Sequence, residues 1–145
     1  MAEALFLVER GWRALRECSL DAGRRGVAVT YLIKGSLSPE VRAMVGLTPL
    51  MRAVDVPRSW FYVTAWWCLI AGALSGRLRW VVCDHERTLA AIKPWAQRLG
   101  VTPVLIRELA DGMELSVEGR VVPLEELCGL KLITVIKKND YSNQL

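Results

Sequence analysis

The sequence has few of the residues and motifs that build metal, redox and phosphate sites. Its four cysteines include no pair at the CxxC spacing that zinc and thioredoxin-like sites use, and His85 is the one histidine. The glycine-rich fingerprints GxGxxG and GxxxxGK[ST] are absent as well. Neither a classical dinucleotide site nor a P-loop is therefore predicted, and no metal site or cofactor is assigned.

The sequence also lacks an apolar run long enough to cross a bilayer. The longest, Trp60–Ala73, lies between Arg58 and Arg77 and counts at most about 17 residues, where a span needs roughly 20. Its tryptophans lie inside the run rather than at the two ends, which fits a membrane belt poorly. A buried helix is favoured over a membrane span. Because the first residues lack the basic start of an export signal, we expect a cytoplasmic location.

Charge of one sign is only mildly in excess. Lys and Arg number 19 against 15 Asp and Glu, which gives a net charge of +4. The densest basic groups are Arg13 with Arg16, Arg24 with Arg25, and Arg77 with Arg79. Nucleic-acid readers concentrate basic residues on one face, and this bias is weaker, so solvated surface charge is favoured over nucleic-acid binding.

What the chain does have is apolar residues, at 52% of its 145 residues. That content excludes disorder for the body of the chain and hints at a buried partner surface. The length fits one domain. We predict a single α/β domain over residues 1–136 and a polar tail over 137–145.

Hydrophobic patterning predicts the elements of this domain. Apolar residues three and four apart predict a helix over Ala2–Cys18, and the continuous run Val27–Ile33 predicts a central strand buried on both faces. The later predicted elements are a helix from Ser38 that restarts at Thr48-Pro49 and ends near Asp55, the Trp-rich helix Arg58–Leu74, a strand Leu78–Cys83, a helix His85–Leu99, a strand Val101–Arg107, a hairpin strand Met113–Val117, a helical turn Pro123–Leu127 and a strand Leu130–Ile136.

Strands that alternate with helices of this length imply right-handed crossovers and a mainly parallel sheet. The closing strands, set off by turn pairs, add an antiparallel hairpin or edge. The predicted fold resembles a Rossmann-like three-layer α/β sandwich. A likeness at the level of the fold does not by itself assign a function.

In such a sheet, ligands bind beyond the carboxyl ends of the strands. The first candidate segment there is Lys34, Gly35 and Ser36, where a charge, a backbone open to close approach and a helix start would suit an anion. The alternative is that this segment is an ordinary connection from a strand to a helix, with serines that cap the helix.

The second candidate segment is Cys83 to Arg87, of which Asp84, His85 and Arg87 are predicted ligand contacts. The alternative is that Asp84 caps the following helix while His85 and Arg87 are solvated. A nucleophile formed by Cys83 and His85 is a further, less favoured hypothesis, because sequence neighbours in a first helical turn seldom face each other.

Three functions follow from these patterns. The leading one is a small Rossmann-like module that binds an anionic small molecule, such as a nucleotide, at the strand ends. The second is a homodimeric interaction module without catalysis, paired through the helix Arg58–Leu74, whose apolar residues cover every face. The third is a metal-dependent nuclease or phosphoesterase that uses Asp84 and Glu108, with Asp111 nearby. Whether the protein is an enzyme is left open.

Overall fold

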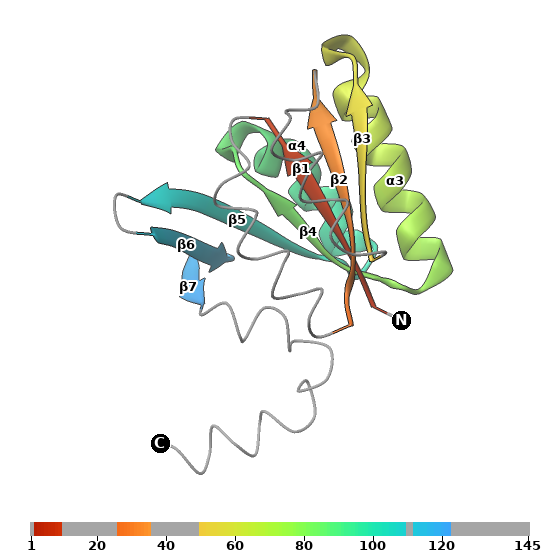
Figure 1. Cartoon of the computed structure of the whole chain (residues 1–145). Helices are drawn as coiled ribbons and strands as arrows, with labels where there is room; N and C mark the ends of the chain where they lie inside the picture. Colours follow the sequence, from red (N-terminus) through yellow and green to blue (C-terminus); the bar gives the residue numbers. More distant parts are fainter. Residues whose placement is uncertain (1, 10–25, 36–49, 110–111, 123–145) are drawn as a thin grey trace.

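The computed structural model describes residues 2–9, 26–35, 50–109 and 112–122. Figure 1 traces the elements along the chain. They are β1 (Glu3–Val8), β2 (Ala28–Lys34), β3 (Met51–Val56), the short 3₁₀ turn η1 (Arg58–Trp60), α3 (Phe61–Ser75), β4 (Leu78–Cys83), α4 (Glu86–Arg98), β5 (Thr102–Leu109), β6 (Gly112–Val117) and β7 (Arg120–Val122).

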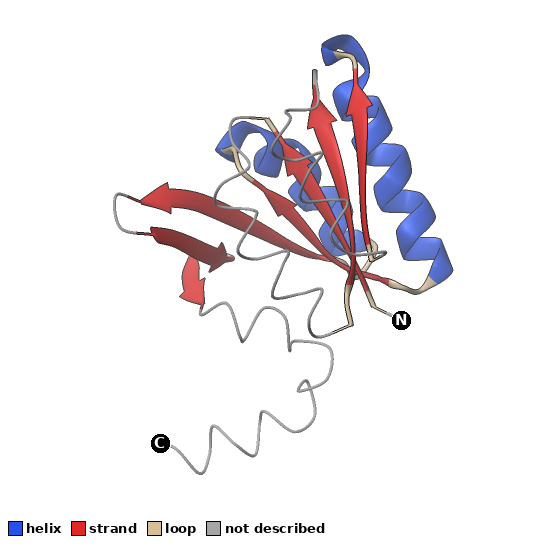
Figure 2. Ribbon diagram, in the orientation of Figure 1, coloured by secondary structure: helices blue, strands red, loops and turns tan. Residues whose placement is uncertain are grey.

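The strands form one mixed sheet in the order β3-β2-β1-β4-β5-β6-β7. The five strands from β3 to β5 are parallel to one another, and β6 and β7 continue the sheet as an antiparallel edge (Figure 2). The predicted α/β fold with a mainly parallel sheet and an antiparallel C-terminal hairpin is confirmed. The strand order reverses between β1 and β4, since successive strands run outward from β1 on one side and from β4 on the other.

Side chains from the sheet enter two separate cores. On one face, Leu5 and Leu7 of β1 pack with Phe61, Ala65 and Leu69 of α3 and with residues of α4. On the other face, a second cluster is buried that includes Phe6, Tyr31, Trp80 and Val104. The two described α-helices cover the first face only (Figure 2). The described residues therefore form two layers, and the third layer of the expected sandwich is not among them.

The prediction of a helix over Ala2–Cys18 is wrong for its first part. Residues Glu3–Val8 form β1, which lies between β2 and β4, and each residue from Ala4 to Val8 is buried. A strand buried on both faces needs no polar alternation, so its continuous apolar run is compatible with either helix or strand. Residues 10–18 lie outside the described part of the chain.

The helix predicted to restart at Thr48 and to end near Asp55 is also wrong where the structure describes it. Met51–Val56 form β3, a parallel edge strand whose register pairs Met51 with Val29 and Val56 with Lys34. Sheet pairing here overrides a weak local pattern, which is common for short segments.

The remaining helices and strands predicted within the described residues are confirmed. The strand Val27–Ile33 corresponds to β2, although β1 rather than β2 is the middle of the parallel part. The Trp-rich helix corresponds to η1 and α3, and the later strands and helix correspond to β4, α4, β5 and β6. The helix from Ser38, the turn Pro123–Leu127, the strand Leu130–Ile136 and the tail 137–145 lie outside the described residues. Among the helices that the structure describes, none has the length and apolar character to cross a membrane.

Candidate functional site at the carboxyl ends of the strands

The two predicted site segments lie at the same edge of the sheet. Lys34 is the last residue of β2 and Gly35 follows it, while Asp84 and His85 follow β4 and Arg87 lies in the first turn of α4. Parallel strands end at one edge, which brings these residues into one region (Figure 1). The sixth predicted residue, Ser36, lies outside the described part of the chain.

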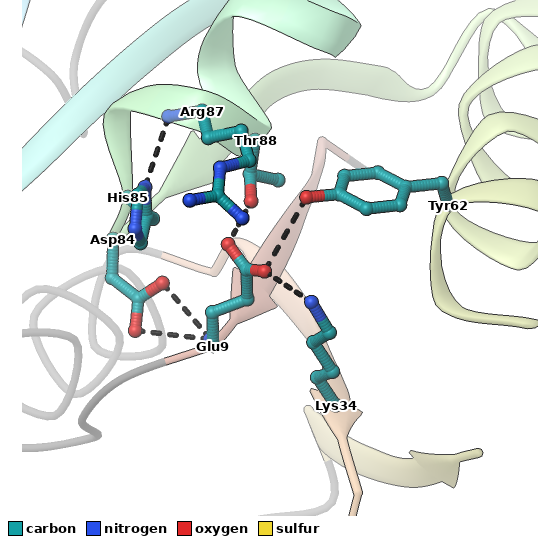
Figure 3. Close-up of polar contacts among 7 residues, drawn as sticks. All are labelled: Glu9, Lys34, Tyr62, Asp84, His85, Arg87 and Thr88. Carbon is teal, nitrogen blue, oxygen red and sulfur yellow. Dashed lines mark hydrogen bonds and ion pairs between the residues drawn. The ribbon is translucent and has the colours of Figure 1, made fainter. Parts of the chain in front are cut away.

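The residue that joins the two segments is Glu9, which directly follows β1. Its carboxylate accepts hydrogen bonds from the Lys34 ammonium at 2.6 Å, from the Tyr62 hydroxyl at 3.4 Å and from the Thr88 hydroxyl. Figure 3 shows these side chains converging on the carboxylate from β2, α3 and α4. The Glu9 side chain is only 7% exposed. A buried carboxylate thus holds three elements of the fold together at this edge.

The side chain of Asp84 contacts the backbone of Glu9. The N–H of Glu9 donates to both carboxylate oxygens of Asp84, at 2.9 and 3.1 Å. The expectation that Asp84 caps the following helix is therefore wrong. His85 is the N-cap of α4, because its Nδ1 accepts the Arg87 N–H at 2.9 Å. The helix cap is thus one residue later than predicted, because the Asp84 carboxylate instead binds the backbone of Glu9 after β1.

The carboxyl group of Glu9 is held in its charged form. Burial by itself raises its pKa, but hydrogen bonds from Lys34 and Thr88, together with the charges of Lys34 and His85, lower the pKa below its ordinary value. Lys34 is held in turn, since its ammonium also lies 5.7 and 5.2 Å from the ring centroids of Phe61 and Tyr62. Aromatic faces at that range attract a cation.

Two further cations border this edge on the solvent side. Arg87 is exposed, and so is Arg58, which begins η1 after Pro57, the one residue that separates it from β3. Arg58 Nε lies 4.0 Å from the position that a Cβ on Gly35 would take. Gly35 has a φ of +100°, a conformation that L side chains rarely adopt. No side chain covers the backbone at Gly35 itself, and the guanidinium of Arg58 lies beside it.

The structure argues against the nucleophile pair of Cys83 and His85. Cys83 is fully buried in the core beneath the helices. Burial raises the pKa of its thiol, and the negative charges of Asp84 and Glu9 raise it further. The reactive form of cysteine is the thiolate, so this thiol is unsuited to nucleophilic attack at neutral pH.

The structure does not test the hypothesis that Asp84 and Glu108 together hold a metal ion. Glu108 lies in β5, but its side chain, like residue Asp111, falls outside what the structure describes. Among the residues whose placement is described, no group of three or more His, Cys, Asp or Glu could hold a metal ion.

Sequence reasoning missed the residue at the centre of this site. The predicted helix Ala2–Cys18 would place Glu9 on its polar face, and Tyr62, Thr88 and Arg58 belong to no motif. The signal that was available is the apolar run Ala4–Val8 followed at once by charged Glu9, which is how a buried parallel strand ends.

Comparison with known proteins adds no homologue to this description. No family model matches the chain, and no curated protein matches it. The site is therefore interpreted from its own geometry, as an edge where side chains of β2, α3 and α4 meet on the carboxylate of Glu9 while Asp84, after β4, accepts its backbone N–H.

Proposed function

We propose that the protein is a binding module for a small anionic molecule, such as a nucleotide, and that the ligand lies at the carboxyl ends of the parallel strands. The observation that carries the proposal is the place of the Glu9 cluster. It stands at the carboxyl ends of β1 and β4, where the strand order reverses, and open α/β sheets bind ligands outside the strand ends at such a reversal.

The distribution of charge supports an anion over a cation. The buried carboxylate of Glu9 is already balanced by Lys34, and Asp84 accepts the Glu9 N–H. Among the described residues on the solvent side of the edge are the guanidinium groups of Arg58 and Arg87, together with the carboxylates of Asp55 and Glu86, of which Glu86 is paired with Arg107. The α4 N-terminus adds the positive end of a 13-residue helix.

The division of labour among these residues follows from burial. Lys34 and Glu9 form the floor, because their ion pair is mostly enclosed, with side chains 22% and 7% exposed. Arg58 and Arg87 are free to meet a phosphate or carboxylate group from solvent, since a guanidinium can donate two parallel hydrogen bonds to either. Gly35 lets a ligand approach the backbone closely. A catalytic step is not part of the proposal, and a cytoplasmic location stays a prediction.

The proposal is tested by thermal shift and calorimetric titration with ATP, ADP, AMP, adenosine and pyrophosphate. A ligand that binds only the folded protein raises the melting temperature. We expect a phosphate-bearing compound to do so and adenosine to have little effect. Arg87→Ala should weaken that binding by roughly tenfold, the loss of one charge-assisted contact.

The matched control is Arg98→Ala, which removes an exposed arginine from the other end of the same helix α4. We expect Arg98→Ala to bind the anion as the wild type does. No shift with any of the phosphate compounds, or an equal loss of affinity in both variants, would overturn the proposal.

A further inference from the structure

The outer face of α3 is an apolar surface with no partner among the described residues. Phe61, Ala65 and Leu69 face the sheet and are fully buried. On the opposite side, Trp67 is 61% exposed and Leu74 is 81% exposed. We expect this helix to be buried almost all round partly by another copy of the chain, and one copy alone leaves its outer face exposed.

The spacing of these outer residues follows the rule for helix pairing. Alternating steps of three and four residues connect the apolar residues of the outer face, which we name the α3 seam: Trp60, Val63, Trp67, Ile70 and Leu74. Steps of three and four are the a and d positions of a heptad, and a stripe of this width is the one that packs against another helix. No charged residue occurs between Phe61 and Ser75.

Aromatic rings widen the seam toward α4. The Trp66 ring makes edge contacts with Trp67 and Trp95, with centroid separations of 5.9 and 5.4 Å. Trp60, Trp67 and Trp95 are 60%, 61% and 42% exposed. At up to ~250 Å² per tryptophan side chain, these three rings offer roughly 400 Å² to a partner. A standard interface buries about 800 Å² on each side, so the tryptophans alone supply half of it before Val63 and Leu74 are added.

We propose that the α3 seam is a homodimer interface in which a second copy of this chain packs its own α3 against the first. The heptad spacing calls for a helix as the partner, and a two-fold axis brings the same helix from the second copy. An uncharged surface can meet itself without repulsion. Helices that lie on a membrane surface carry Lys and Arg beside their apolar face, whereas α3 has no charged residue. The seam lies outside the Glu9 cluster, so the proposal is independent of the proposed function.

The test is sedimentation equilibrium of the full chain over a series of concentrations. We expect a dimer of twice the 16.2 kDa chain mass. Trp67→Glu and, separately, Leu74→Glu place a charge in the seam at exposed positions, so circular dichroism and the melting temperature should stay near the wild-type values. Each variant should raise the dimer dissociation constant by roughly 30-fold or more, as the loss of an interface hot spot does.

The matched control is Val121→Glu, the same kind of change at a 61% exposed apolar residue on β7, away from α3. It should dimerise as the wild type does. A wild-type monomer at every concentration, or a Trp67→Glu variant that dimerises normally, would overturn the proposal. Binding of a monomeric wild type to phosphatidylcholine–phosphatidylserine vesicles that Trp67→Glu abolishes would overturn it in favour of a membrane surface.

Discussion

The backbone N–H of Glu9 donates to both carboxylate oxygens of Asp84, across 75 residues of sequence. Glu9 follows β1 and Asp84 follows β4, which are parallel neighbours at the reversal of strand order. The bond extends the contact between β1 and β4 beyond their last paired residues, Leu7 and Cys83. The Glu9 side chain then turns the other way, toward Lys34 and Thr88. One residue thus ties both halves of the sheet to the candidate site.

We expect loss of the Asp84 carboxylate to destabilise the fold. Asp84→Ala leaves the partly buried N–H of Glu9 without this acceptor, which costs about 1–3 kcal/mol. Asp84→Asn should cost less, because the amide oxygen still accepts a hydrogen bond. Urea unfolding measures both. The control is Asp55→Ala, at an exposed aspartate near the end of β3, for which we expect a change within about 0.5 kcal/mol. Equal losses at the two positions would contradict the assigned role of Asp84.

The ion pair between Glu9 and Lys34 should appear as a coupling between the two residues. We expect Glu9→Gln and Lys34→Met each to lower the free energy of unfolding, since each leaves a largely enclosed charge without its counter-charge. The double variant should lose less than the sum of the single losses, with a coupling of about 1–3 kcal/mol. Additive losses in this double-mutant cycle would mean that the contact contributes nothing of its own.

The same carboxylate should make stability sensitive to acid. The pKa of Glu9 is lowered in the folded protein from its ordinary value of 4.5, through hydrogen bonds and charges that outweigh burial. The unfolded chain therefore binds the proton first, and the stabilisation by Glu9 is present above pH 4.5 and lost as the pH falls through the lower, folded-state pKa. Glu9→Gln lacks this titration. The gap in unfolding free energy between wild type and Glu9→Gln should narrow on acidification below pH 4.5, and a constant gap would contradict the pKa direction.

Gly72→Ala tests the packing of α3 on the sheet. An added Cβ would lie 2.8 Å from Cβ and from Cδ2 of Leu78, closer than side chains approach one another. Alanine favours a helix over glycine by about 1 kcal/mol, but overpacking of this kind costs about 1–3 kcal/mol. We expect a net destabilisation in thermal or urea unfolding. Leu78→Ala should not rescue the variant, because alanine keeps the Cβ that lies 2.8 Å away. A stabilising Gly72→Ala variant would show that the helix shifts freely.

Most of the sheet could be predicted from patterns that are local in sequence. Val27–Ile33 and Leu78–Cys83 are apolar runs with turn residues at their ends, and the turn pair Glu118-Gly119 marks the final hairpin. The strands β1 and β3 could not be predicted in this way. The run Ala4–Val8 is short and apolar throughout, so its periodicity does not separate helix from strand. β3 is a strand because Met51–Val56 pair with β2.

The sequence predicts the location of the candidate site at the strand ends, but it does not predict the contacts around Glu9. The rule that ligands bind at strand ends selected Lys34 and Asp84, and the structure brings both to one edge. A helix over Ala2–Cys18 does not bring Glu9 to this edge, so the pattern that predicts the helix hides the role of Glu9. Thr88 is fully buried although it is polar, and the reason for its burial is the Glu9 carboxylate that its hydroxyl reaches. That contact depends on the docking of α4, which no local pattern contains.

The position of β1 in the middle of the parallel strands has a consequence for how the chain folds. β1 pairs with β2 on one side and with the distant β4 on the other. Closing so long a loop costs entropy before the pairing of β1 with β4 stabilises the sheet, so we expect refolding to be slow and to be limited by that encounter. Until it occurs, β1 and β4 each present an open edge of apolar residues to other molecules. We therefore expect the yield of refolded protein to fall at high concentration, because the open edges of β1 and β4 aggregate.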